Sequence, residues 1–183
     1  PKGADAANAI PAPKRELKVI RPEPIYITAE SDAELGLDSY DVYTLFNLGN
    51  DCIKKKDYPR AIKFFKKLLE KFPRSLHLPA ALFNLGLALE QSKQYQQADR
   101  YYQRLLSDFP NSKHITDTRF RQGECLIKQK RYAEAQKIFS HLANKNLPTS
   151  SKLEAISQLS LCLIKQKNYS LAEDTLWMGI HIY

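Results

Sequence analysis

Glycine and cysteine are scarce in this sequence. Six glycines stand among 183 residues, which disfavours a turn-rich β structure and favours helices. The three cysteines form no C-x-x-C pair, so a thioredoxin-like centre or a cysteine metal site is not predicted. Each lies among apolar residues, and we expect buried free thiols, which lean towards a reducing compartment. Cys125 and Cys162 could form a disulfide only if they faced each other across adjacent helices.

Signals of catalysis and of membrane insertion are also missing. No apolar run approaches the roughly 18 residues that span a bilayer, and no signal peptide is visible. The sequence shows neither a glycine-rich phosphate loop nor a nucleophile–base pair, so it predicts no enzyme, no cofactor and no metal. The net charge of +8 fits nucleic acid, anionic lipid or an acidic protein. The lysines fall at solvent-facing helix positions, however, so a nucleic-acid partner is not favoured.

Residues 1–38 differ from the rest of the chain. They hold five of the ten prolines, which fix φ and remove backbone donors, and so predict a Pro-rich extended arm. Two interpretations stay open, a plain tether or an arm that docks on a repeat surface through residues such as Val19 and Tyr26. Ser31–Glu34 resembles a capping box and predicts one helical turn. The chain starts at Pro1 rather than Met, so we expect membrane attachment only by a tether outside this fragment.

An internal repeat organises the remainder, residues 39–183. The segment Leu45–Gly49 reads LFNLG and returns 37 residues later as Leu82–Gly86. The same interval separates four tyrosines and four alanines, namely Tyr58, Tyr95, Tyr132 and Tyr169, and Ala61, Ala98, Ala135 and Ala172. A fixed period of this size predicts a solenoid of stacked units, here about 39–75, 76–112, 113–150 and 151–183.

Each unit has the pattern of a helix, a short turn and a second helix. In the first unit, apolar residues at helical spacing predict helices over Tyr43–Lys55 and Ala61–Phe72. Asp57 is the expected N-cap of the second helix, with Pro59 in the first turn. Pro73 ends that helix. We therefore predict an all-α domain.

These residues resemble the tetratricopeptide repeat, whose pattern is W-x2-L-G-x2-Y, then A-x3-F, then P. The matching residues are Leu45, Leu48, Gly49, Ala61, Phe65 and Pro73 in the first unit, and Leu82, Leu85, Gly86, Ala98, Tyr102 and Pro110 in the second. The third unit departs from the pattern at Arg119 and Gln122. The resemblance implies a tetratricopeptide solenoid of four helix–turn–helix units, a fold whose members act as non-catalytic protein-binding adaptors.

The 37-residue units are longer than the usual repeat of about 34 residues. The extra residues lie in two joints of the form F-P-x-S, Phe72–Ser75 and Phe109–Ser112. Long units with this joint resemble tetratricopeptide proteins of the bacterial cell envelope, of the YbgF/CpoB and BamD type. This resemblance implies a periplasmic or outer-membrane-associated protein, including a lipoprotein. The three cysteines favour the alternative, a cytoplasmic protein.

In this family the first helices of the units line a concave face, so the resemblance implies a peptide groove there. The residues expected in it are Tyr43, Phe46, Asn47, Asn50, Phe83, Asn84, Leu87, Phe120, Arg121, Glu124 and Lys128, with Leu161 and Lys165 continuing the row. Phe46, Phe83 and Phe120 predict an aromatic ladder beside amides that could bind a peptide backbone. The alternative is that the ladder is only the consensus of the family. A carboxylate clamp is not predicted, because Phe46 and Asp117 stand where it needs lysines.

The sequence ends in a strongly apolar run, Leu176–Tyr183. Solenoids normally end in a polar capping helix, so we expect either that further chain follows or that this face meets a partner or a second copy. The residues expected in that contact are Trp177, Met178, Ile180, Ile182 and Tyr183.

The sequence thus predicts a non-catalytic adaptor that binds a peptide or partner helix in its groove, within a bacterial cell-envelope complex. The alternative is a structural or assembly subunit, or an oligomer, that acts through its apolar C-terminal end and its N-terminal arm. Under both hypotheses the partner is another protein, and the C-terminal end could form a homo-oligomer.

Overall fold

The computed structural model describes residues 40–181 of the chain. These residues belong to the second of the two units into which the chain divides, Gly36–Tyr183. Three predictions therefore lie outside the described range. They are the extended arm over 1–38, the helical turn at Ser31–Glu34, and a contact role for Ile182 and Tyr183.

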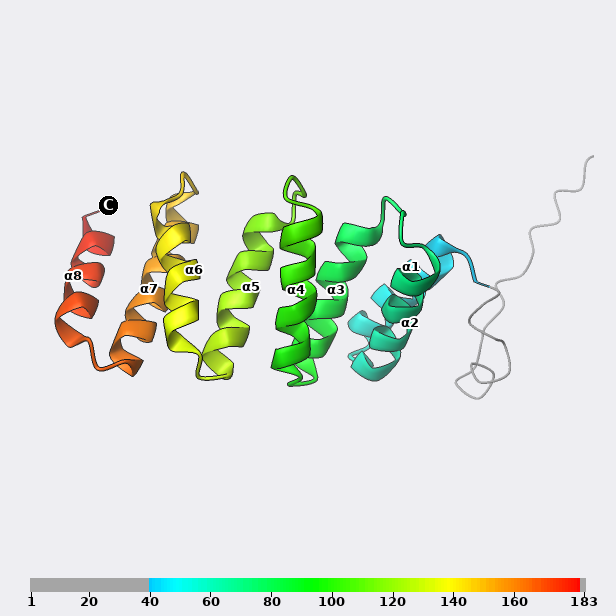
Figure 1. Cartoon of the computed structure of the whole chain (residues 1–183), viewed down its shortest axis with the longest axis horizontal. Coiled ribbons are helices and arrows are strands. Elements are labelled where there is room, and N and C mark those ends of the chain that lie inside the picture. Colours follow the sequence, from blue (N-terminus) through cyan, green and yellow to red (C-terminus); the bar gives the residue numbers. More distant parts are fainter. Residues whose placement is uncertain (1–39, 182–183) are drawn as a thin grey trace, which may run out of the picture. The chain divides into compact units, whose positions relative to one another are not determined.

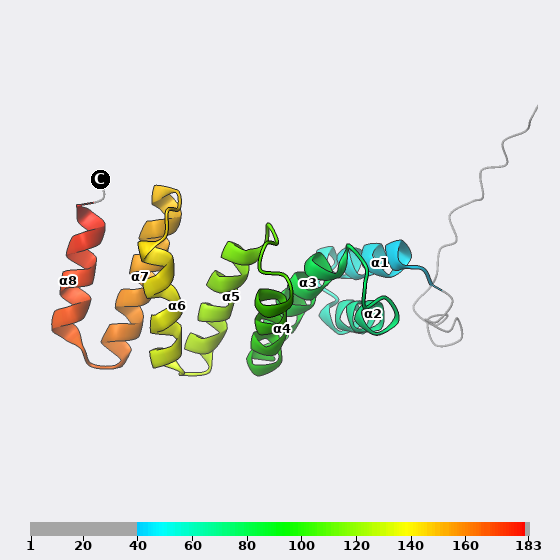
Figure 2. The same cartoon turned by 45° about the horizontal axis from the view of Figure 1, so that its top comes forward.

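Eight α-helices and no strand make up the described part of the chain (Figure 1). Their bounds are α1 Val42–Lys54, α2 Tyr58–Lys71, α3 Leu78–Gln91, α4 Tyr95–Asp108, α5 Ile115–Lys128, α6 Tyr132–Asn144, α7 Thr149–Lys165 and α8 Tyr169–Ile180. Each helix packs against the next one along the chain, from α1 to α8, as the turned view in Figure 2 also shows. The predicted all-α solenoid of four helix–turn–helix units is thereby confirmed.

Glycine allows the two helices of a unit to approach closely. A Cβ atom built at Gly49 would lie 2.6 Å from Cζ of Phe65, on the second helix of the unit. In the next two units, a Cβ at Gly86 or Gly123 would overlap the equivalent ring in the same way. No side chain fits at these positions unless the aromatic ring moves, so glycine at the crossing follows from the aromatic residue that fills the space beside it.

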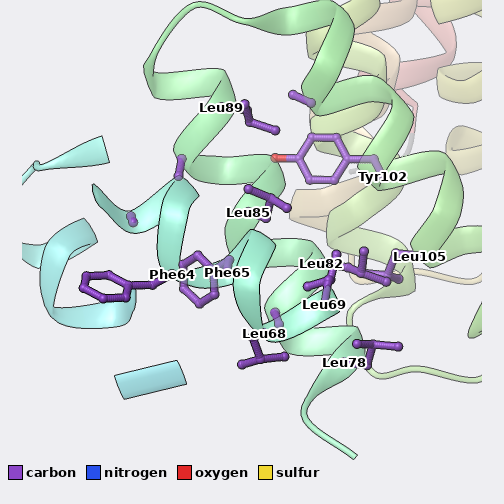
Figure 3. Close-up of a cluster of buried hydrophobic side chains, with 14 of the residues drawn as sticks. Phe64, Phe65, Leu68, Leu69, Leu78, Leu82, Leu85, Leu89, Tyr102 and Leu105 are labelled. Atoms are coloured by element: carbon purple, nitrogen blue, oxygen red, sulfur yellow. The ribbon is translucent and has the colours of Figure 1, made fainter. Parts of the chain in front are cut away.

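The core consists of two clusters of buried apolar side chains, one from α1 to α5 and one from α5 to α8. In Figure 3, buried side chains from α2, α3 and α4 come together, among them Phe65, Leu82 and Tyr102. None of these three side chains has exposed surface. Burying an apolar side chain of this size stabilises the fold by roughly 1.5–3 kcal/mol. A single helix pair could not cover these faces, so neighbouring units complete the core.

The turn inside each unit places one residue in the left-handed region. This residue is Lys56, Lys93, Lys130 or Lys167, with φ between 59° and 65°. In the first unit the N–H of Lys56 donates to the carbonyl of Ile53 at 2.9 Å, and the N–H of Asp57 donates to the carbonyl of Cys52 at 2.8 Å. These two bonds are the Schellman pattern that ends a helix. Glycine is the usual residue with a left-handed conformation. A lysine at this position therefore gives no sequence signal of the left-handed turn.

The second helix of the first unit begins one turn earlier than predicted, at Tyr58 rather than Ala61. Asp57 is confirmed as its N-cap, because its carboxylate accepts the N–H of Arg60 at 3.3 Å. Pro59 lies in the first turn, as expected. Hydrogen bonds from Arg60 hold the pKa of Asp57 below its ordinary value. The prediction was short by one turn because apolar spacing starts only at Ala61.

The three cysteines are buried thiols that form no disulfide, as predicted. Burial raises the pKa of the Cys125 thiol to about 12 and that of Cys162 to about 11. At neutral pH these thiols are therefore protonated and behave as small apolar groups.

A buried polar contact joins α4 to the third unit. Asp99 is 2% exposed, and its carboxylate accepts Nε2 of Gln122 and Nη1 of Arg131, both at 2.9 Å. The residues equivalent to Asp99 and Gln122 between α2 and α3 are Ile62 and Leu85. The departure of the third unit from the repeat pattern is thus explained at Gln122, which satisfies a buried carboxylate.

Candidate functional site

The first helices of the units, α1, α3, α5 and α7, carry equivalent residues on one face. On α1 and α3 this face is rich in amides, and Nδ2 of Asn84 donates to Oδ1 of Asn50 at 2.7 Å. On α5 the same two repeat positions hold Arg121 and Glu124. The face therefore changes from paired amides to charged groups between the second and the third unit.

The predicted aromatic ladder packs into the joints between units. The rings of Phe46 and His77 have centroids 5.2 Å apart, and those of Phe83 and His114 are also 5.2 Å apart, stacked at 18°. Phe83 also meets the ring of Tyr102 on the second helix of its unit, at 6.3 Å. Because both phenylalanines are half-buried between two rings, their first role is to hold the joints.

Phe120 lacks the covering histidine. The repeat position of His77 and His114 holds Ser151 in the last unit. His77 and His114 each precede a helix, whereas Ser151 lies in the first turn of α7, which starts earlier in its repeat than α3 or α5. Phe120 is half-buried, as Phe46 and Phe83 are, and its partners among the described residues do not include a histidine ring.

Two pockets open over α5, between residues of α3 and α7. The larger, of about 530 Å³, is lined by Glu90, Gln91, Lys93, Tyr95, Arg121, Glu124, Cys125, Ile127, Lys128, Gln158 and Leu161. The smaller, of about 300 Å³, is lined by Phe83, Thr116, Asp117, Phe120, Arg121, Glu124, Ser151 and Glu154. Both pockets include Arg121 and Glu124, so they meet at this pair. We call the two pockets together the α5 groove.

The α5 groove contains part of the predicted groove set. The predicted residues that line it are Phe83, Phe120, Arg121, Glu124, Lys128 and Leu161. The remaining predicted residues lie elsewhere on the first helices and line neither pocket, namely Tyr43, Phe46, Asn47, Asn50, Asn84, Leu87 and Lys165. The two pockets thus lie over the third unit and its neighbours rather than along the whole array.

Sequence reasoning predicted Glu124 in the groove but missed its other acidic residues, Glu90, Asp117 and Glu154. Glu90 carried a signal, because its repeat position holds Ile53, Ile127 and Ile164 in the other three units. A single charged residue in an otherwise apolar column indicates a local partner. Asp117 and Glu154 carried none, since exposed carboxylates on helices are usually only solvated.

Arg121 is held between two carboxylates. Its Nη1 lies 3.4 Å from Oε1 of Glu90 and 3.4 Å from Oε2 of Glu124. Glu90 is nearly buried, with 13% of its side chain exposed, and its Oε2 accepts the hydroxyl of Tyr102 at 3.1 Å. Burial raises the pKa of Glu124, and the nearby charges of Glu90 and Glu154 raise it further. Arg121 opposes this rise, but burial outweighs it.

The last helix leaves apolar side chains uncovered. Leu176, Trp177, Met178 and Ile180 are between 46% and 61% exposed. Leu176 stands at the repeat position of Phe139, which is fully buried where α6 packs on α5. Of the predicted partner face, the three residues within the described range are thus exposed on α8.

No metal site or membrane span is found in residues 40–181. No group of three or more histidine, cysteine, aspartate or glutamate side chains there could hold a metal ion. No helix in that range is both long and apolar enough to cross a bilayer.

The fold and the groove define a helical-repeat protein of the kind that binds other proteins. Family models of the tetratricopeptide repeat match residues 40–110 and 83–144, together more than half of the chain. The chain belongs to the tetratricopeptide repeat family, whose members generally mediate protein–protein interactions and are typically non-catalytic scaffolds. No curated protein matches the chain.

Solved structures show the same fold at low sequence identity. MamA of MSR-1 is 17% identical, with a TM-score of 0.68 over 82% of this chain and 81% of that one. YrrB, described as a tetratricopeptide protein with an unusual peptide-binding site, is 24% identical, with a TM-score of 0.67 over 79% and 70%. A tetratricopeptide protein of Parabacteroides merdae ATCC 43184 is 20% identical, with a TM-score of 0.67 over 77% and 53%.

Proposed function

We propose that this chain is a non-catalytic adaptor that binds an extended peptide segment of another protein in the α5 groove. The observation that carries the proposal is that two pockets meet at one half-buried charged pair, Arg121 and Glu124. An extended peptide directs alternate side chains to the same side, so two adjoining pockets suit two of its side chains. Gln91 and Gln158 in the larger pocket can bind its backbone. YrrB, with its peptide-binding site, supports this use of the fold.

Selection from a random 12-residue peptide library displayed on phage tests the proposal. Selected peptides should bind the native chain and lose at least tenfold in affinity with Gln158→Ala/Leu161→Ala, which strips one wall of the larger pocket. The matched control is Gln96→Ala/Leu76→Ala, because Gln96 is exposed on α4 and Leu76 is 97% exposed in a joint. Circular dichroism of both variants verifies the fold. Equal affinity for both variants would rule out the groove.

We further propose that the adaptor works in a bacterial cell-envelope complex. The F-P-x-S joints, the 37-residue units and the Pro-rich residues 1–38 support this setting. Three buried cysteines that form no disulfide suit the cytoplasm equally well. Fractionation of the source cells, followed by protease digestion after the outer membrane is opened, tests it. Protection of the chain until the inner membrane is also broken would place it in the cytoplasm.

A second candidate function is that of an assembly subunit acting through α8. The exposed side chains of Leu176, Trp177 and Ile180 favour it, because a helix that ended an isolated solenoid would carry polar residues there. Light scattering over a concentration series should then detect a second copy, and Trp177→Lys/Ile180→Lys should restore the monomer. A native chain that stays monomeric at high concentration excludes self-association through this face.

A further inference from the structure

The smaller pocket of the α5 groove combines two aromatic walls with an excess of negative charge. Phe83 and Phe120 form the aromatic part, and Asp117, Glu124 and Glu154 supply carboxylates. Arg121 is the one cation among the lining residues. Three carboxylates against one guanidinium make this pocket acidic on a chain whose net charge is +8.

A repeat position has changed at this pocket. In the first two joints, His77 packs on Phe46 and His114 packs on Phe83. At the start of the fourth unit the equivalent residue is Ser151, which itself lines the smaller pocket. A hydroxymethyl group cannot cover a ring as an imidazole does. Phe120 therefore lines the smaller pocket together with the acidic residues, without a histidine ring on it among the described residues.

Arg121 cannot neutralise the pocket, because it is already engaged. Its Nη1 is 3.4 Å from both Glu90 and Glu124, and Glu90 lies outside the smaller pocket. No salt bridge to Asp117 or Glu154 is formed within residues 40–181. An added cation between these two carboxylates and the ring of Phe120 would complete the charge balance, with the ring face contributing a cation–π contact.

We infer that the smaller pocket binds the basic side chain of a peptide, and an arginine in preference to a lysine. A guanidinium can stack its plane on Phe120 while its edge donates to Asp117 and Glu154, whereas an ammonium cannot do both. The pocket thus has the opposite polarity to a clamp for a carboxylate. This inference rests on the proposed function. It specifies the bound peptide as a segment that carries an arginine at a fixed position.

The phage selection tests the inference when the recovered sequences are aligned. Peptides selected on the native chain should share a basic position, and a synthetic peptide with citrulline in place of that arginine should bind at least tenfold more weakly in fluorescence anisotropy. Lysine at that position should give intermediate affinity. Asp117→Asn/Glu154→Gln should remove the preference for arginine over citrulline. The control Glu70→Gln/Asp108→Asn makes the same change in net charge on exposed residues of α2 and α4 and should leave the preference intact.

A second pair of variants tests access to the smaller pocket. Ser151→His adds an imidazole to a residue that lines the smaller pocket, and the larger side chain should weaken binding of the arginine peptide at least tenfold. Ser150→His puts the same side chain on the exposed neighbouring residue and should have no effect. If selected peptides depend on Gln158 and Leu161 but share no basic position, this inference fails and the groove stands. If no peptide depends on those residues, the proposed function fails as well.

Discussion

The first two units and the last two differ in how closely they keep the repeat pattern. The helices α1 and α3 carry the same LFNLG segment, their amides pair with each other, and histidines cover their phenylalanines. In α5 and α7 the equivalent positions hold Arg121, Gln122 and Ser151. Gln122 forms a buried hydrogen bond to Asp99, whereas Ser151 lines the smaller pocket. The departures therefore change a contact between units in one case and a surface in the other.

The largest expected effect is at the glycine crossings. Gly86→Leu should lower the free energy of unfolding by about 3 kcal/mol or more, because its Cβ would overlap the fully buried ring of Tyr102. Gly179→Leu in α8 should cost less than about 1 kcal/mol. A Cβ at Gly179 lies 3.2 Å from Ile156, next to an open pocket of about 250 Å³. Urea denaturation measures the free energy of unfolding of both variants. Equal losses would show that Gly86 and Gly179 are equally constrained by their neighbours, contrary to this prediction.

The second prediction concerns the polar contact between α4 and the third unit. Asp99→Ala should cost roughly 2–4 kcal/mol, because it leaves the buried amide of Gln122 without its acceptor and removes one of the two carboxylates that bind Arg131. Asp99→Ile/Gln122→Leu copies the residues found between α2 and α3, and should recover most of that loss. A double variant no more stable than the single one would show that the two junctions are not interchangeable.

The sequence predicts contacts that repeat from unit to unit better than contacts that occur once. The period, the helix pairs and glycines such as Gly86 follow from residues that repeat, because the glycine–aromatic contact recurs in the first three units. The α5 groove does not repeat. It depends on Glu90 and Arg121, which lie 31 residues apart and meet only in the folded chain. The loss of a histidine at Ser151 was visible in the sequence, but its consequence required knowing that the earlier histidines cover phenylalanine rings. The buried Nε of Arg119 has no partner in the described residues, and nothing in the structure explains it.

The turns should respond alike in both halves of the array. Lys93 and Lys167 have φ of 59° and 65°, a conformation that costs a residue with a side chain roughly 1–2 kcal/mol. Lys93→Gly and Lys167→Gly should each raise the free energy of unfolding by about 0.5–1 kcal/mol, since part of the gain is offset by the greater freedom of glycine in the unfolded chain. Thermal denaturation measures the two values. A gain at one turn and a loss at the other would show that the turns are not equivalent.

The smallest expected effect is a pH-dependent one at Glu124. Burial, together with the charges of Glu90 and Glu154, raises its pKa above the ordinary value of 4.5. A carboxyl whose pKa is raised by folding stabilises the fold below its unfolded pKa, and that contribution is lost as the pH rises through the folded pKa. At pH 7 the ionised group opposes folding, so Glu124→Gln should raise the free energy of unfolding there by about 0.5 kcal/mol or less, given solvent screening.

At pH 4 the same substitution should have no such effect, because the native carboxyl is then largely protonated. Glu134 is the matched control in the same unit, since hydrogen bonds from Arg131 hold its pKa below the ordinary value. Glu134→Gln should therefore change stability in the opposite direction at pH 7. Melting temperatures of the two variants at both pH values decide the point. If Glu124→Gln lowered the melting temperature at pH 7, the pairing of Glu124 with Arg121 would outweigh the crowding of carboxylates, and the α5 groove would already be balanced without a bound cation.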